Sequence, residues 1–252
     1  MTCKALAALL NRELKIDAFH DVSHNGLQIE NTGPITKVMV AVDGVVETLE
    51  AAAQAGAQML IVHHGISWGD SLAQITGANY RIISTALRHN IALYGVHLPL
   101  DAHPVLGNNA QMAKALGLTG LRPFLDYHGQ KIGFSGELPE MMTRESFETL
   151  VRQVVRPRRI DFFKCGVERV QTVGICSGGA PEGIAQAAQA GLDVYLCGEA
   201  NLMAYNMAHD WQQNALFAGH YATERFGVFA LATWLEQHTD LTVERLDQNL
   251  PY

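Results

Sequence analysis

Apolar residues recur along this chain with two different periods, and together the patterns predict alternating helices and strands. Residues 3–14 carry apolar side chains at helical spacing, which predicts a first helix. Continuous apolar runs at 38–42 and 59–62 are typical of strands buried on both faces. A helical pattern over 45–55 joins them, so this part of the chain is predicted to form a strand–helix–strand unit of a parallel sheet.

The same alternation continues to the end of the chain. The first half is further predicted to contain an extended segment at 24–28, a loop at 65–78, a helix at 80–89, a strand at 91–94 and a helix at 109–116. The second half is predicted to contain strands at 132–136, 170–176, 193–197, 215–218 and 241–246, with helices at 143–155, 182–190, 201–213 and 225–237. Strands separated by single helices predict an α/β fold.

The two halves resemble each other, which predicts an internal duplication. Residues 52–56 match residues 187–191 at an offset of 135 positions, and residues 93–97 match residues 216–220 at an offset of 123 positions. Chance explains an alanine-rich match, but it is a poor explanation for strand, histidine and acid recurring in register.

We therefore predict two similar α/β domains, residues 1–125 and residues 126–252. Their boundary is approximate, and an exchange of terminal elements between them stays open. Each domain places a histidine after an apolar strand with an acid four residues later, as in His97 with Asp101 and in His220 with Glu224.

Two adjacent histidines, His63 and His64, close the apolar run 59–62 and are followed by Gly65. Metal ligation is a function that makes ready use of two neighbouring imidazoles. Successive strand residues point to opposite faces, so both rings reach one site only if the backbone bends there, which Gly65 permits. Histidines that bond only to backbone at a strand end are the alternative interpretation.

Open parallel sheets bind ligands beyond the carboxyl ends of their strands. Those ends are predicted to carry four imidazoles and three carboxylates: His63, His64, His97, Asp101, Glu199, His220 and Glu224. This set suits one or two divalent transition metal ions such as Zn, Fe, Mn or Co, with a carboxylate able to bridge two ions. For His97 a hydrogen-bonded pair with Asp101 is the alternative, and Glu199 is equally well a polar residue at a strand end.

Composition excludes some classes of protein. A net charge of −7 and an isoelectric point near 5.8 argue against general nucleic-acid binding. The one basic run, at 156–159, is interpreted as a solvated helix end. Four scattered cysteines, no secretory signal and no apolar run of membrane-spanning length predict a cytoplasmic protein with free thiols and no membrane partner. Trp68, in the loop at 65–78, is either loop packing or a lid over an aromatic ligand.

Four motifs make the chain similar to a known family. They are IVHHG at 61–65, YGVHLPLDAHP at 94–104, GNN at 107–109 and GHYATE at 219–224. The chain resembles the Nif-three-like family over nearly its whole length. Within that family it is similar to the bacterial YbgI-type branch, the GTP cyclohydrolase 1 type 2 homologues. Gly65 departs from the proline that many relatives have there.

This resemblance implies a dinuclear metal centre in the cleft between two similar α/β domains, within a ring-shaped homohexamer. Carried over by position, the implied ligands are His63, His64, Asp101, His220 and Glu224. His97 is expected beside these ligands, as a sixth ligand or as a catalytic proton shuttle.

The function expected from this resemblance is that of a dinuclear metal-dependent hydrolase acting on a nucleotide-like or related small substrate. The resemblance suggests the GTP cyclohydrolase reaction, in which activated water attacks C8 of guanine and formate is lost. No glycine-rich phosphate loop of the P-loop or Rossmann kind is present. A metal-handling or regulatory protein without turnover is the alternative, and an interaction scaffold is a third possibility.

Overall fold

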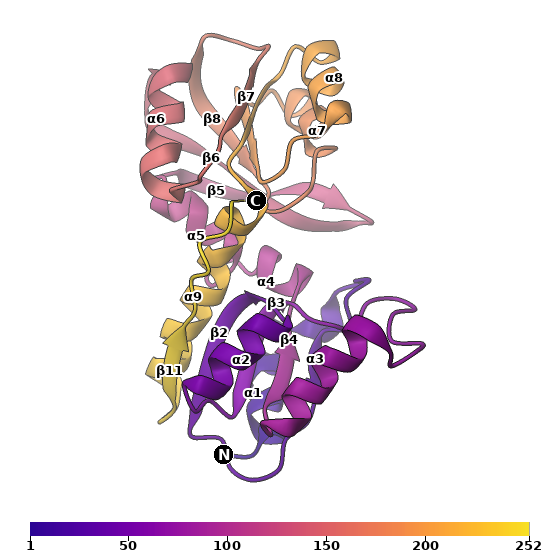
Figure 1. Ribbon diagram of the computed structural model, residues 1–252. Helices are drawn as coiled ribbons and strands as arrows, with labels where there is room; N and C mark the ends of the chain where they lie inside the picture. The colour runs from indigo at the N-terminus through magenta and orange to yellow at the C-terminus, as the bar shows by residue number, and fades with distance from the viewer. Residues whose placement is uncertain (252) are drawn as a thin grey trace. The chain divides into compact units, whose positions relative to one another are not determined.

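The computed structural model describes residues 1–251, which pack into two compact units (Figure 1). The first unit contains Met1–Leu100 and Val228–Gln248, and the second contains Asp101–Gly227 with residues 249–251. These units differ from the expected ranges 1–125 and 126–252. The physical reason is strand pairing. Strand β5 (Thr119–Tyr127) pairs with β6 (Gln130–Thr143) in the second unit, and β11 (Thr242–Arg245) pairs with β2 (Lys37–Asp43) in the first.

The first unit is built on a sheet with the order β1-β4-β3-β2-β11. Its strands are β1 (Gly26–Ile29), β2 (Lys37–Asp43), β3 (Met59–His64), β4 (Ala92–Gly95) and β11 (Thr242–Arg245). All neighbours run parallel except β1, which is antiparallel to β4 at the edge. The central strands are almost fully buried, as their continuous apolar runs predict.

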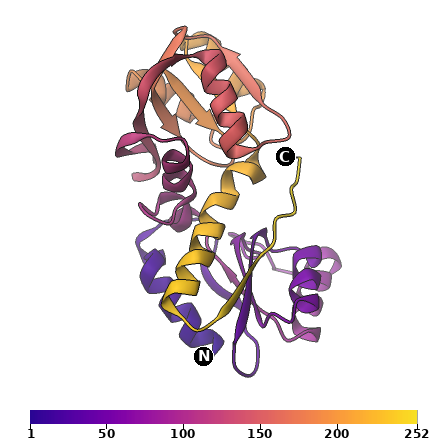
Figure 2. The same ribbon diagram turned by 90° about the vertical axis from the view of Figure 1, so that its left-hand side faces the viewer.

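Helices cover both faces of this sheet. They are α1 (Cys3–Leu14), the short 3-10 helix η1 (Ile16–Ala18), α2 (Val46–Gln54), α3 (Gly77–Arg88) and the C-terminal part of α9 (His220–His238). Figure 2 shows the sheet between α2 and α3 on one side and α1 with the end of α9 on the other. An apolar cluster that includes Leu49, Leu60 and Leu93 joins α2 to the strands.

The second unit is built on a sheet with the order β5-β6-β8-β9-β10-β7. Its strands are β5 (Thr119–Tyr127), β6 (Gln130–Thr143), β7 (Asp161–Lys164), β8 (Arg169–Ile175), β9 (Val194–Cys197) and β10 (Asn214–Phe217). Strands β8, β9 and β10 are parallel, and the outer strands are antiparallel to their neighbours.

The helices of the second unit pack on this sheet. They are α5 (Asn108–Ala115), α6 (Arg144–Val155), α7 (Gly183–Gln189), α8 (Leu202–Asp210) and the first turns of α9, while α4 (Leu98–Ala102) connects the two units along the chain. Side chains cap two of these helices, since Thr143 accepts from the Ser146 amide and Asn201 from the Ala204 amide. The core includes Phe147, Val173 and Leu196.

The two units share a strand order. In the first it is β1-β4-β3-β2, and in the second it is β7-β10-β9-β8. In both, the edge strand comes first along the chain and is antiparallel to the last of three parallel strands. Each third parallel strand is followed at once by a helix.

Most predicted elements are confirmed, but some were missed or misplaced. The short helices η1 and α4 were not predicted. Strands β5 and β7 were not predicted either, because β5 is mostly exposed and contains Gly120 and Pro123, and no residue of β7 is fully buried. Helix α9 begins at His220 rather than near 225, so the GHYATE motif is its first turn. Within residues 1–251 no helix is long and apolar enough to cross a membrane, and all four cysteines are free thiols.

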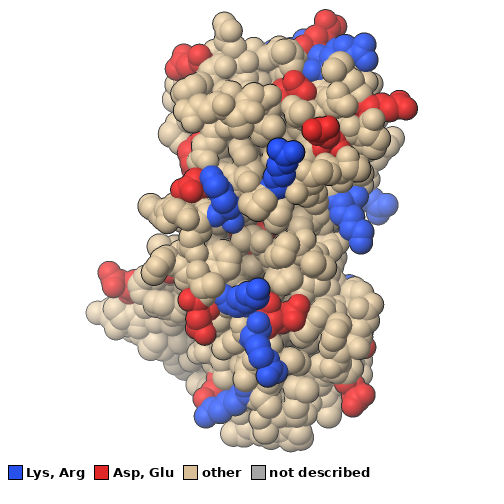
Figure 3. All heavy atoms as spheres, turned by 180° about the vertical axis from the view of Figure 1, so that it is seen from behind, with Lys and Arg blue, Asp and Glu red and all other residues tan. Residues whose placement is uncertain are grey.

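Charged side chains are dispersed on the face shown in Figure 3. Lysine and arginine lie singly or in small groups among acidic and uncharged residues, and no broad basic patch covers that face. This agrees with the acidic composition, which argues against general binding to a nucleic-acid backbone.

Gly65 follows the paired histidines, and a substitution there tests how the loop after β3 is packed. Gly65 does not have a positive φ, so glycine is required there by space. A Cβ at Gly65 would overlap the carboxamide of Gln28, which accepts from the Ile66 amide at 2.7 Å and donates to the His24 carbonyl at 2.8 Å. We expect Gly65→Ala to lower the free energy of unfolding by about 1–2 kcal/mol, measured by urea denaturation.

The control is the same substitution in a Gln28→Ala background, where the carboxamide is gone and Gly65→Ala should cost much less. An equal loss in both backgrounds would contradict this account of the glycine.

Candidate metal centre

Three histidines meet at the carboxyl ends of β3 and β4 in the first unit. His63 and His64 end β3, and His97 follows β4. The ring centroids lie 4.7 Å apart for His63 and His64, 5.2 Å for His63 and His97, and 5.8 Å for His64 and His97. One potential ligand atom from each residue lies within 4.8 Å of the other two, so the group could hold a metal ion.

Each of these rings has an oxygen at its Nδ1 atom. The acceptors are the Val96 carbonyl for His63 at 2.9 Å, Asp43 Oδ1 for His64 at 2.8 Å, and Asp21 Oδ1 for His97 at 2.9 Å. A carbonyl oxygen only accepts, so His63 Nδ1 carries the proton and the lone pair of a neutral ring is on Nε2. Hydrogen bonding of the second ring nitrogen to carboxylate or carbonyl is how proteins orient histidine ligands of metals.

Asp21 holds His97 through hydrogen bonds, and no pattern in the sequence pointed to Asp21. Its Oδ2 accepts from the Leu98 amide and from the Asn25 side chain, both at 3.0 Å, while Asn25 Oδ1 accepts from the His97 amide at 2.7 Å. Burial alone would raise the pKa of Asp21, but the hydrogen bond and charge of His97, with further donors from Asn25 and Ser23, outweigh it and lower the pKa to about 2. The carboxylate therefore stays ionised beside the imidazole.

Trp68 packs against this histidine group. Its indole lies edge-on to the His97 ring at 4.9 Å and tilted to the His64 ring at 5.9 Å, measured between centroids. The indole Nε1–H donates to the Gly65 carbonyl at 2.7 Å, which fixes the ring orientation. The structure thus shows Trp68 as packing on the histidines, and this aromatic cover reduces the solvent around them.

A second group lies in the other unit, where α9 begins. His220 Nδ1 is 2.8 Å from Glu199 Oε1, and its Nε2 is 3.0 Å from Glu224 Oε1. Burial alone would lower the pKa of His220, but the hydrogen bonds and charges of Glu224 and Glu199 outweigh it and raise the pKa to about 9. Gly178, at φ +66°, allows this packing, because a Cβ there would overlap Glu224 Oε1.

Asp101 is held by a buried polar network that the sequence analysis did not identify. Its Oδ1 accepts from Asn108 Nδ2 and from the Ser177 hydroxyl, both at 2.9 Å. Asn108 Oδ1 in turn accepts from the Gly227 amide of α9 at 2.6 Å, and Asn109 Nδ2 donates to the Asp101 carbonyl at 3.3 Å. These hydrogen bonds fix the orientation of the Asp101 carboxylate.

The structure therefore brings the expected residues together in two groups. His63, His64 and His97 form one group in the first unit, and His220 with Glu199 and Glu224 forms the other in the second unit, which also holds Asp101. That the two groups share one centre stays a prediction. The imidazole nitrogens of the first group, and the imidazole and carboxylates of the second, are donors that suit divalent transition ions, so the residues present fit such a metal.

Comparison with known proteins identifies the family. A model of the Duf34/NIF3 (NGG1p interacting factor 3) family matches residues 1–250, and the chain belongs to this family. A protein of Deinococcus radiodurans is 42% identical over 231 residues, which cover 92% of this chain and 87% of that protein. A protein of Pasteurella multocida is 36% identical over 251 residues, which cover 100% of both chains. Each of these relatives is named GTP cyclohydrolase 1 type 2 homolog, which confirms the similarity expected from the motifs.

The fold is shared with solved structures. The structure of protein ybgI, described as a protein of unknown function, superposes with a TM-score of 0.94 at 34% identity over 100% of both chains. The two-sheet α/β architecture is therefore that of a family with known structures.

Because of the buried Asp21 carboxylate, the free energy of unfolding should depend on pH in the acid range. A folded-state pKa below the unfolded value contributes stability above about pH 4, and this contribution is lost as the pH falls toward 2. We expect Asp21→Asn to flatten the loss of unfolding free energy between pH 5 and pH 2.5 by up to about 2 kcal/mol, measured by denaturant titrations.

Asp70→Asn, in an exposed part of the loop, is the matched control and should leave the pH profile unchanged. If the Asp21 and Asp70 variants lose stability in parallel with the unmodified protein, Asp21 is not the group responsible.

The Asp101 network should be costly to break. Asn108→Ala removes a donor from Asp101 and an acceptor from the Gly227 amide in a fully buried place. We expect the free energy of unfolding to fall by roughly 2–4 kcal/mol, measured by chemical denaturation. Asn79→Ala removes a hydrogen bond that an exposed amide makes to Gln74, and it should cost less than about 0.5 kcal/mol. Similar losses for both variants would contradict the buried network.

Proposed function

We propose that this protein is a metal-dependent hydrolase whose ligands are His63, His64, Asp101, His220 and Glu224. The observation that carries the proposal is the oxygen placed at Nδ1 of each histidine in both groups, since this orients imidazoles as ligands. Simple backbone-bonded histidines would explain His63 but not the carboxylates at His64, His97 and His220.

The shared strand order supports an internal duplication that gives each unit one part of a dinuclear centre. His63 and His64 end β3 and Glu199 follows β9, which occupy the same place in the two sheets. His97 and His220 follow β4 and β10, which also correspond. On this proposal the domains are two copies of one α/β unit, and two divalent ions such as Zn, Fe, Mn or Co are bound in the cleft between them.

Divalent ions bound by these residues would polarise a substrate and acidify a water molecule enough for attack near neutral pH. On this proposal His97 moves a proton, and the Asp21 carboxylate at its Nδ1 supports this role because it would stabilise the imidazolium formed when Nε2 accepts one. Trp68 would exclude water from the same side and keep the rings of His64 and His97 in place.

The relatives' name, GTP cyclohydrolase 1 type 2 homolog, suggests a nucleotide-like or related small substrate. A homohexamer in the cytoplasm remains part of the proposal. A metal-handling protein without turnover is the second candidate, favoured by the 56% exposure of the Glu199 side chain, which would allow ions to exchange with solvent.

The test is His64→Ala, with His89→Ala at the exposed end of α3 as control. We expect His64→Ala to lose most bound metal and at least about 100-fold in metal-dependent turnover while the fold is kept, because one ligand is removed. The measurements are elemental analysis of protein purified without added metal, followed by a screen of nucleotides and phosphoesters with the dominant ion.

Full turnover in the His64→Ala variant would show that the hydrolase proposal is wrong. Ready metal exchange without metal-dependent turnover of any substrate would instead favour the metal-handling role.

A further inference from the structure

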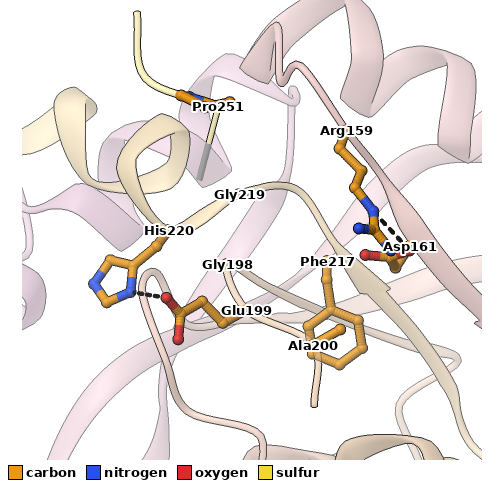
Figure 4. A pocket seen from close by; sticks show the side chains of 9 residues that line it. All are labelled: Arg159, Asp161, Gly198, Glu199, Ala200, Phe217, Gly219, His220 and Pro251. Carbon is orange, nitrogen blue, oxygen red and sulfur yellow. Dashed lines mark hydrogen bonds and ion pairs between the residues drawn. The ribbon is translucent and has the colours of Figure 1, made fainter. Parts of the chain in front are cut away.

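The second unit contains an open cavity of about 350 Å³ that begins at His220 (Figure 4). One wall carries the His220–Glu199 pair, and another carries Arg159 with Asp161. Between them the lining is made by the small residues Gly198, Ala200 and Gly219 and by the aromatic ring of Phe217. The volume is at the lower end of the range for small-molecule sites.

Arg159 belongs to the basic run at 156–159, and the structure separates the members of that run. Arg156 ends α6, where its amide donates to the Arg152 carbonyl, as expected of a helix end. Arg158 Nε lies 3.5 Å from Asn249 Oδ1. Arg159 lines the cavity, so the interpretation of the whole run as a solvated helix end is incomplete.

The ion pair with Asp161 orients the Arg159 guanidinium but uses only part of its hydrogen-bonding capacity. Nη2 and Nε both donate to one oxygen, Asp161 Oδ1, at 2.8 and 3.2 Å. A guanidinium has five N–H donors in a planar fork, so most of its capacity to bind an anion remains after two are used. The side chain is 78% exposed, and exposed ion pairs stabilise folding little, so a structural role explains this pair poorly.

We propose that this cavity binds the phosphate end of a phosphorylated substrate, with Arg159 as the residue that recognises the phosphate. The inference rests on the proposed function, because it places the reacting end of that substrate at His220. A chain of net charge −7 repels anions and therefore needs a local cation to hold one, and arginine matches phosphate oxygens in bidentate fashion. Such a site also explains how a chain without a P-loop could bind a nucleotide.

The experiment is calorimetric titration of inorganic tripolyphosphate into the protein as purified, into Arg159→Gln and into Arg158→Gln. Both substitutions remove one positive charge from the same run, but of the two side chains only Arg159 lines the cavity. We expect Arg159→Gln to weaken binding roughly 10- to 100-fold and Arg158→Gln by less than about 3-fold. GTP should bind the unmodified protein more tightly than guanosine, and the difference should shrink by a similar factor in Arg159→Gln.

Absence of tripolyphosphate binding by the unmodified protein, or equal weakening in both variants at equal metal content, would overturn the proposal. The readout does not need turnover, so the two proposals fail separately. Binding that depends on Arg159, without any metal-dependent turnover, would show that the hydrolase proposal is wrong and that the phosphate-site proposal is right. Turnover of a phosphorylated substrate with a KM unchanged by Arg159→Gln would support the hydrolase proposal and contradict the phosphate site.

Discussion

The arrangement of this protein depends on how its histidines are held. A free imidazole rotates and exchanges its proton between two nitrogens, so it is a poorly defined ligand. Here the rings of His63, His64, His97 and His220 each have an oxygen at Nδ1, from one main-chain carbonyl and three carboxylates. The oxygen at Nδ1 sets the ring orientation, and in His220 a second carboxylate, that of Glu224, also faces Nε2. Without these acceptors the same histidines would be a polar cluster of undefined geometry.

The sheets explain why the acceptors can be where they are. Parallel strands end at one edge, so residues that follow neighbouring strands come close without any long-range design. Asp43 ends β2 directly beside His64 at the end of β3, and the two are register partners. In the second unit Glu199 follows β9 and reaches the histidine that follows β10. Each pair is thus a consequence of strand adjacency.

Sequence reasoning identified the histidines together with Asp101, Glu199 and Glu224, but fewer of the residues that hold them. Asp43 had a signal, since it follows an apolar strand just as His63 follows the next. Asp21 had none, because it lies in an irregular loop and reaches His97 across 76 positions of sequence. The boundaries of the two units could not be predicted from local sequence patterns either, since β11 joins the first sheet by pairing with β2. Periodicity reports which face of an element is buried, whereas such contacts depend on partners far along the chain.

Gly227 illustrates a practical consequence of this close packing. It lies inside α9, where glycine weakens a helix, and replacing helical glycines with alanine is a common route to more stable proteins. A Cβ at this position would come within 2.7 Å of Asn108 Oδ1 and 2.9 Å of the Asn108 amide. The helix therefore keeps glycine, a residue of low helix propensity, at position 227. Its lack of a side chain lets the Asn108 carboxamide, which donates to Asp101, approach the helix backbone. A substitution chosen by helix propensity alone would therefore force Asn108 to move and disturb the carboxylate that it helps to hold.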